Sequence, residues 1–228
     1  MSDFMLDSWS FSRYRNWANC AAQVKYQRLV KRKVSNAAMD RGVDVHASLE
    51  NAVKARAMPR KMHEAAEGAR AVVVKLRELR RTKEAVVNVE LERAHTSKWK
   101  LTRFFAADAW LRLKIDVHER HDTYTMIRDW KTGKPHPEWD VLQASLYALS
   151  EFKADPSVSD VRVKFHFVER SDVAEMSYTR KRDELPLTRD WLARVKPMLA
   201  DRLFRERPGF QCRWCPFRKE LGGPCKSA

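Results

Sequence analysis

Glycine is scarce in this chain, with six glycines among 228 residues, and no glycine-rich loop of the kind that cradles nucleotide phosphates is present. No apolar run approaches the roughly 20 residues that a bilayer-spanning helix needs. The first residues also lack the basic and apolar regions of a secretory signal peptide. These absences argue against a nucleotide-binding α/β fold and against a membrane protein, and we expect a cytosolic protein.

Acidic residues are in the minority. The chain has 30 Asp and Glu against 45 Lys and Arg, which gives a formal net charge of +15. Such an excess favours a polyanionic partner, because neutralised phosphates release counterions. Nucleic acid is therefore the first partner to consider, and an anionic membrane surface is the rival. The hydrophobic fraction of 44% is ordinary for a globular protein and allows a real core.

Hydrophobic periodicity predicts an α/β protein with a central mixed sheet flanked by helices. Helices are expected over residues 10–33, 44–57, 61–81, 137–153 and 187–206. Strands are expected over residues 85–93, 103–107, 110–118 and 123–131, followed by a hairpin over 160–169 and 173–179. The tail from 210 to 228 has little periodicity but carries three cysteines.

One strand is expected to end in Asp129-Trp130-Lys131. Residues i and i+2 of a strand point to the same face, so Asp129 and Lys131 project side by side. Asp116 lies on the polar face of the preceding strand, 13 residues earlier, and a short hairpin would bring its carboxylate to that of Asp129. Asp108 is its main competitor. Two such carboxylates can hold Mg²⁺, although an Asp-x-Lys on a strand surface is common without any metal.

Four short motifs follow one another in the chain: Gly42–His46 (GVDVH), Leu113–Asp116 (LKID), Asp129–Gly133 (DWKTG) and Gln143–Tyr147 (QASLY). In this order they resemble the RecB-type branch of the PD-(D/E)XK nuclease superfamily, which shows G-x-x-x-H, G-x-x-D, D-x-K-T-G and Q-x-x-x-Y. Leu113 stands where that family usually has glycine, a departure that removes no catalytic group. The resemblance implies a restriction-endonuclease-like core.

The resemblance also assigns roles to residues. Asp116, Asp129 and Lys131 would be catalytic, and His46 would join the two aspartates as a ligand of Mg²⁺ or Mn²⁺, its imidazole favouring Mn²⁺ somewhat. Gln143 would lie beside the site and Tyr147 near the DNA backbone, both on one helix face, and Glu90 would be a supporting carboxylate. The plain alternatives are a solvent-exposed His46, a helix boundary at Gln143 and Tyr147, and an exposed strand residue at Glu90.

The chain has four cysteines, Cys20, Cys212, Cys215 and Cys225. In a reducing cytosol they are not expected to form structural disulfides. The segment 9–20 and the late C-x-x-C followed by proline resemble RecB-like nucleases with an iron–sulfur cluster, including the AddB nuclease domain and CRISPR-associated RecB-like exonucleases. Four thiolates suit a [4Fe–4S] cluster or zinc. The ligands from both chain ends favour the cluster, and four unrelated buried thiols are the plain alternative.

Taken together, these observations predict one nuclease domain over residues 1–228, with its core at about 84–206. Residues 1–60 and 207–228 would form a helical lobe joined by the metal cluster. The expected activity is Mg²⁺- or Mn²⁺-dependent hydrolysis of DNA, as an exonuclease acting on ends or single strands in recombination, repair or phage DNA processing. A helicase or recombination protein would be a partner, and a phage-encoded chain would act in the host cytoplasm.

Two alternatives belong to other classes of protein. The first is a non-catalytic DNA-binding or scaffold protein that retains the nuclease fold, which the joint presence of Asp116, Asp129 and Lys131 disfavours. The second is a zinc-stabilised RNA-binding protein, which would need no divalent metal at the carboxylates.

Overall fold

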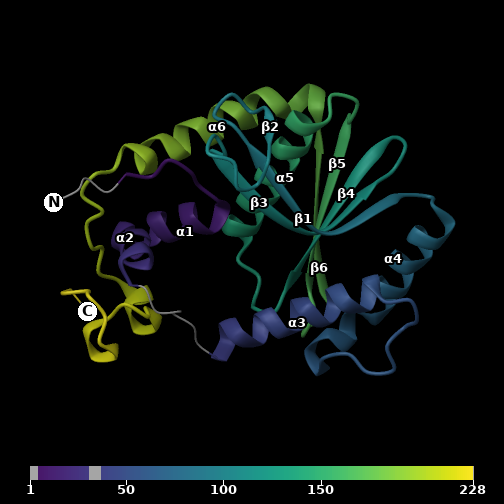
Figure 1. Ribbon diagram of the computed structural model, residues 1–228, viewed down its shortest axis with the longest axis horizontal. Helices are drawn as coiled ribbons and strands as arrows, with labels where there is room; N and C mark the ends of the chain where they lie inside the picture. The colour runs from purple at the N-terminus through teal and green to yellow at the C-terminus, as the bar shows by residue number, and fades with distance from the viewer. Residues whose placement is uncertain (1–4, 31–36, 228) are drawn as a thin grey trace. The chain divides into compact units, whose positions relative to one another are not determined.

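The computed structural model describes residues 5–30 and 37–227 (Figure 1). The chain divides into two compact units. The terminal unit comprises residues 1–36 and 189–228, and the central unit comprises residues 37–188.

The helices have the following bounds: α1 Phe11–Asn19, α2 Ala21–Leu29, α3 Ala37–Lys54, α4 Arg70–Thr82, α5 Pro137–Ala154 and α6 Arg180–Ala200. Short 3₁₀ helices are η1 Glu64–Ala69, η2 Phe210–Trp214 and η3 Lys219–Leu221. The strands are β1 Val86–His95, β2 Leu101–Thr102, β3 Leu111–Arg120, β4 Tyr124–Lys131, β5 Asp160–Phe167 and β6 Asp172–Thr179.

The six strands form one sheet in the order β2-β1-β3-β4-β5-β6. Strands β4 and β5 pair in parallel, and all other neighbours pair antiparallel. The parallel pair needs a crossover, and α5 supplies it between the two strands. The predicted mixed sheet flanked by helices is therefore confirmed.

The two faces of the sheet are covered by different helices. Val117 and Trp130 point to one face, where they join an apolar cluster with α3, η1 and α4. The neighbouring positions His118 and Thr125 point to the opposite face and contact Glu151 of α5. Figure 1 shows α3 and α4 on one side of the strands and α5 on the other. Both faces of the sheet are thus covered by helices.

Helix α3 belongs to the central unit, although the sequence division assigned residues up to 60 to a terminal lobe. Its side chains Val45, Leu49 and Ala52 are fully buried in the cluster with α4 and the sheet. Burial of a valine or leucine side chain such as Val45 or Leu49 contributes about 1.5–3 kcal/mol. This packing fixes α3, and with it His46, against the sheet that carries Asp116.

Several predicted boundaries were wrong. Residues 10–33 form two helices, because Cys20 between them has extended backbone with φ −157° and ψ 108°; residues 31–33 of that prediction lie outside the described residues. The predicted helix 44–57 begins earlier, at Ala37, and the first part of 61–81 is the 3₁₀ helix η1. Helix α6 begins at Arg180 rather than at 187 and ends at Ala200 rather than at 206.

The strand predicted over 103–107 is a loop, and only Leu101–Thr102 pair with β1. In this loop, side-chain hydrogen bonds take the place of the backbone hydrogen bonds that a strand would make. The Arg112 Nε donates to the Phe104 carbonyl at 2.7 Å, and the Thr102 hydroxyl donates to Asp108 at 2.8 Å. Phe105 in this loop is 82% exposed, so its ring is not buried as in a core strand.

The terminal unit has an aromatic core. Trp9 stacks on Trp191 with ring centroids 5.6 Å apart, and Phe11 and Tyr14 meet Trp191 edge-on. The Trp17 indole donates to Asp201 at 2.9 Å. Aromatic rings therefore join α1 to the second half of α6, so segments from both ends of the chain meet in one unit.

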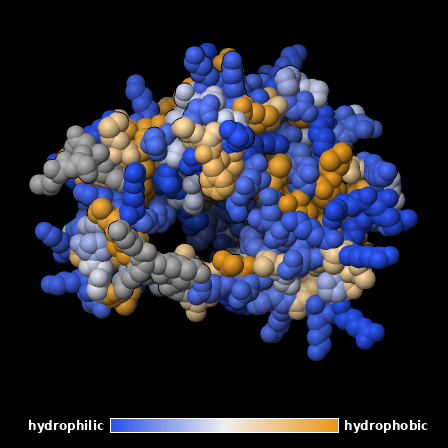
Figure 2. All heavy atoms as spheres, in the orientation of Figure 1, coloured by the Kyte–Doolittle hydropathy of each residue, from blue (hydrophilic) through white to orange (hydrophobic). Residues whose placement is uncertain are grey.

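Hydrophilic residues cover most of the face in view in Figure 2, in keeping with the high content of charged residues. Among the described residues, the structure contains no helix of the length and apolarity needed to cross a membrane.

A buried polar network links α5 to the sheet. Glu151, which is 1% exposed, accepts from Arg93, from His118 at 3.0 Å and from Thr125 at 3.1 Å. Burial alone would raise the pKa of Glu151, but the His118 and Arg93 contacts outweigh it and hold the pKa at about 2. The network's contribution to stability is thus present above the ordinary carboxyl pKa of about 4.3 and is lost as the pH falls towards 2.

We expect Glu151→Ala to lower the free energy of unfolding by about 3–5 kcal/mol, because it leaves a buried guanidinium without its partner. The control is Glu175→Ala, which removes the surface pair with Lys164 and should cost under about 1 kcal/mol. Urea denaturation of both variants measures the difference. Equal, small losses would show that the network does not stabilise the fold.

Candidate active site

Three carboxylates lie in one row across β1, β3 and β4. The β3–β4 ladder ends at the pair Val117–Arg128, and the next opposed residues in that register are Asp116 and Asp129. In the β1–β3 ladder, the pairs on either side place Glu90 opposite Asp116. Directly opposed residues of antiparallel strands share a face, so register alone gathers Glu90, Asp116 and Asp129.

The backbone is distorted along this row. The Trp130 N–H, which would continue the ladder, instead donates to the Asp116 carboxylate at 2.7 Å. Glu90 has a φ of 54°, in the left-handed region that costs a non-glycine residue about 1–3 kcal/mol. The regular pairing between Glu90 and Asp116 is absent, although the register is the same on both sides. Local strain at a cluster of carboxylates is typical of a functional site.

Helix α3 adds an imidazole to the row. The His46 Nδ1 lies 3.3 Å from the Asp116 Oδ1. Ligand atoms of His46, Glu90 and Asp116 all lie within 4.8 Å of one another, so these three side chains can hold a metal ion. One nitrogen and two carboxylate oxygens suit Mn²⁺ or Mg²⁺ with water completing the coordination. Glu90, which the sequence suggested only as a supporting carboxylate, is thus a full member of this group.

Asp129 is held by other partners. Its carboxylate lies 2.6 Å from the Lys131 Nζ and accepts from the Tyr147 hydroxyl at 2.8 Å and from the Gln143 amide at 3.0 Å. Gln143 in turn accepts from Lys131 at 2.8 Å. The structure therefore brings together all four of these predicted residues. Tyr147 is only 3% exposed, so its hydroxyl positions Asp129 and does not lie on an open DNA-facing surface.

The crowding of negative charge shifts the ionisation of the site. Burial and the charge of Asp129 raise the pKa of Asp116, and burial and the charge of Asp116 raise the pKa of Glu90. Burial would lower the pKa of His46, but its hydrogen bond to Asp116 and the neighbouring carboxylates raise it to about 9. A row of carboxylates that favours a proton will also favour a divalent cation in its place.

Asp108, the competitor of Asp116, lies outside this group. It accepts from the Thr102 hydroxyl in the exposed loop before β3. Sequence reasoning named Glu90 as a supporting carboxylate but did not place it opposite Asp116. Its signal was the register: pairing β1 with β3 would have placed Glu90 opposite Asp116.

The four cysteines belong to the terminal unit. They line one pocket together with Gln23, Tyr26 and Glu206, and none of the four is in a disulfide bond. The Cys20 sulfur accepts from the Arg207 N–H at 3.3 Å, and the Cys212 sulfur accepts from the Gly209 N–H at 3.4 Å. Cysteines almost 200 residues apart in the chain thus meet at one place in the fold.

The mixed sheet, the opposed carboxylates of β3 and β4 and the lysine two residues after Asp129 define a nuclease-like core. The family model described as "PDDEXK_1: PD-(D/E)XK nuclease superfamily" matches residues 8–219. The chain therefore belongs to the PD-(D/E)XK nuclease superfamily, whose members generally hydrolyse phosphodiester bonds in nucleic acids with divalent metals.

Two further comparisons add little. A solved structure described as "Crystal structure of SSO0001" has 14% sequence identity and a TM-score of 0.47, over 98% of this chain and 88% of that one. A similarity at this level supports no argument about activity. Comparison with the curated proteins found no match.

Proposed function

We propose that the protein is a Mg²⁺- or Mn²⁺-dependent deoxyribonuclease with its metal at His46, Glu90 and Asp116. The observation that carries the proposal is the row of three carboxylates, together with the imidazole 3.3 Å from Asp116. A divalent ion bound there would polarise the scissile phosphodiester and lower the pKa of a bound water. Asp129, opposed to Asp116 across the splayed strands, would complete the coordination directly or through water.

The remaining side chains have defined tasks. Lys131 is held between the Asp129 carboxylate and the Gln143 carbonyl oxygen, so its ammonium has a fixed position beside the carboxylate row. There it would orient the attacking water or stabilise the charge that develops on the phosphate. Gln143 and Tyr147 are positioning residues, because both donate to the Asp129 Oδ2.

For the substrate and pathway, the support is the resemblance to the RecB-type branch and the net charge of +15. We propose DNA ends or single strands as substrate, exonuclease action, and a role in recombination, repair or phage DNA processing in the cytoplasm, with a helicase or recombination protein as partner. A non-catalytic scaffold is disfavoured, because Asp116, Asp129 and Lys131 are all present and their neighbours hold them at one site.

We expect metal-dependent cleavage of end-labelled DNA that Asp129→Ala and Lys131→Ala each reduce by at least about 100-fold, in the range that removal of a catalytic group costs. Single- and double-stranded substrates with Mn²⁺, Mg²⁺ or chelator should be compared, and the label pattern gives the polarity. Asp108→Ala is the matched control and should cleave as the wild type does. DNA binding without cleavage under every metal condition would favour the scaffold.

We further propose that Cys20, Cys212, Cys215 and Cys225 bind a structural [4Fe–4S] cluster. The backbone N–H donors to the Cys20 and Cys212 sulfurs are the kind of contact that stabilises bound thiolates. The four cysteines line one pocket although they come from both ends of the chain. This split arrangement favours the cluster, and a tetrahedral zinc site is the alternative.

We expect protein purified without oxygen to be brown, to absorb towards the blue end of the visible spectrum, and to contain about four irons, as a [4Fe–4S] cluster requires. Cys215→Ser should lose the absorbance and lower the melting temperature, since the cluster links both chain ends of the terminal unit. Colourless protein with one zinc per chain would show that the four cysteines bind zinc and not a cluster. Protein without metal would show that the four cysteines are structural thiols.

A further inference from the structure

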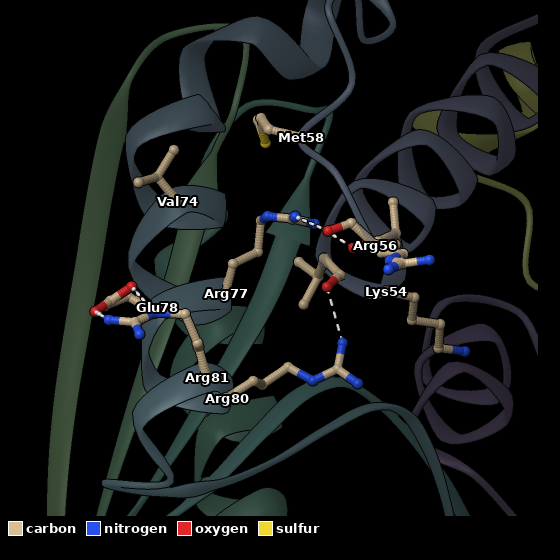
Figure 3. Close-up of a pocket in the computed structure, with 10 residues that line it drawn as sticks. Lys54, Arg56, Met58, Val74, Arg77, Glu78, Arg80 and Arg81 are labelled. Atoms are coloured by element: carbon tan, nitrogen blue, oxygen red, sulfur yellow. Dashed lines mark hydrogen bonds and ion pairs between the residues drawn. The ribbon is translucent and has the colours of Figure 1, made fainter.

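A basic pocket lies at the C-terminal end of α3, against α4 (Figure 3). It has a volume of about 520 Å³, in the range of sites that bind small ligands. Its lining includes five cationic side chains and one carboxylate: Lys54, Arg56, Arg77, Arg80, Arg81 and Glu78. Such a lining favours an anionic ligand.

Two of the cations have a structural role. The Arg77 guanidinium donates to the carbonyls of Ala52 and Ala55, each at 2.7 Å, and Arg80 donates to the Val53 carbonyl at 2.8 Å. Ala52 and Val53 lie in the last turn of α3, whose carbonyls have no partner within the helix, and Ala55 directly follows the helix. Arg77 and Arg80 therefore cap α3 and neutralise the negative end of its dipole.

The caps do not account for the remaining cations. Arg56 is exposed, and its guanidinium has no hydrogen-bond or ion-pair partner among the described residues. Lys54 pairs with Glu50 at 2.5 Å. Arg81 pairs with Glu78, and Figure 3 shows that pair turned away from Arg77 and Arg80. Arg56 thus supplies positive charge that no side-chain contact among the described residues uses, and Lys54 lies two residues before it in the chain.

The pocket is lined in part by α3, the helix that also carries the candidate metal ligand His46. His46, Glu50 and Lys54 are spaced four residues apart, so they follow one face of α3. At 1.5 Å per residue, the backbone of Lys54 lies about 12 Å from that of His46. That interval corresponds to roughly three to four nucleotides along one strand of a duplex, at about 3.4 Å each.

We propose that this pocket binds the phosphodiester backbone of the substrate a few nucleotides from the scissile bond. Arg56 and Lys54 would contact phosphate oxygens, and the apolar surface of Met58 and Val74 in the same pocket would meet the sugars. The inference rests on the proposed function, because it takes the substrate to be nucleic acid. It adds a second, metal-independent contact region that fixes where the strand enters.

The test is the affinity of the full chain for labelled single- and double-stranded DNA in chelator, where no cleavage occurs, across a series of salt concentrations. We expect Arg56→Glu to weaken binding roughly three- to tenfold near 0.1 M salt and to reduce the slope of log K against log salt by about 0.7–0.9. Arg56→Lys keeps the charge and should bind as the wild type does. Equal melting temperatures show that the variants are folded.

Lys181→Glu is the matched control, because it makes the same charge change on the exposed start of α6, which follows β6 at the sheet edge away from β1. It should leave affinity and slope nearly unchanged. If Arg56→Glu and Lys181→Glu behave alike, the pocket is not a DNA contact and its arginines only cap α3. If Arg56→Glu alone weakens binding while the wild type cleaves nothing, the pocket stands and the nuclease proposal fails.

Discussion

The central constraint on this molecule is the mutual repulsion of three carboxylates in one row of the sheet. Glu90, Asp116 and Asp129 lie opposite one another on neighbouring strands, and like charges so placed destabilise a sheet. The structure offsets the repulsion with His46, Lys131, the Trp130 N–H and the hydroxyl of Tyr147. The strained φ of Glu90 and the splayed ends of β3 and β4 belong to the same compromise. A divalent cation would relieve the repulsion most directly.

The surrounding fold serves this row. The apolar face of α3 is buried against the sheet, which brings His46 to Asp116. On the opposite face, α5 delivers Gln143 and Tyr147 to Asp129, and one turn later it anchors itself through Glu151 in the buried network with Arg93 and His118. Helices α3 and α5 thus contribute both packing against the sheet and polar contacts to the site.

Much of this could be predicted from the sequence, and the rest could not for identifiable reasons. Alternating polarity in 110–118 and the triplet at Asp129 suffice to predict β3, β4 and the opposed aspartates, because a hairpin register is local. The place of Glu90 depends on which strand pairs with which. The helix break at Cys20 depends on the extended backbone of that residue. The start of α6 depends on Asp183, whose carboxylate accepts from the Thr179 N–H at 2.7 Å. The arginine caps of α3 leave no periodic signal at all.

The most direct test of the central claim is Mn²⁺ binding by isothermal titration calorimetry or electron paramagnetic resonance, with no nucleic acid present. Wild-type protein should bind Mn²⁺, and Asp116→Asn should weaken that binding roughly tenfold or more, because it removes a charged ligand from the row. Asp108→Asn, an exposed aspartate in the preceding loop, should bind as the wild type does. Undiminished Mn²⁺ binding by Asp116→Asn would contradict a metal centre at the carboxylate row.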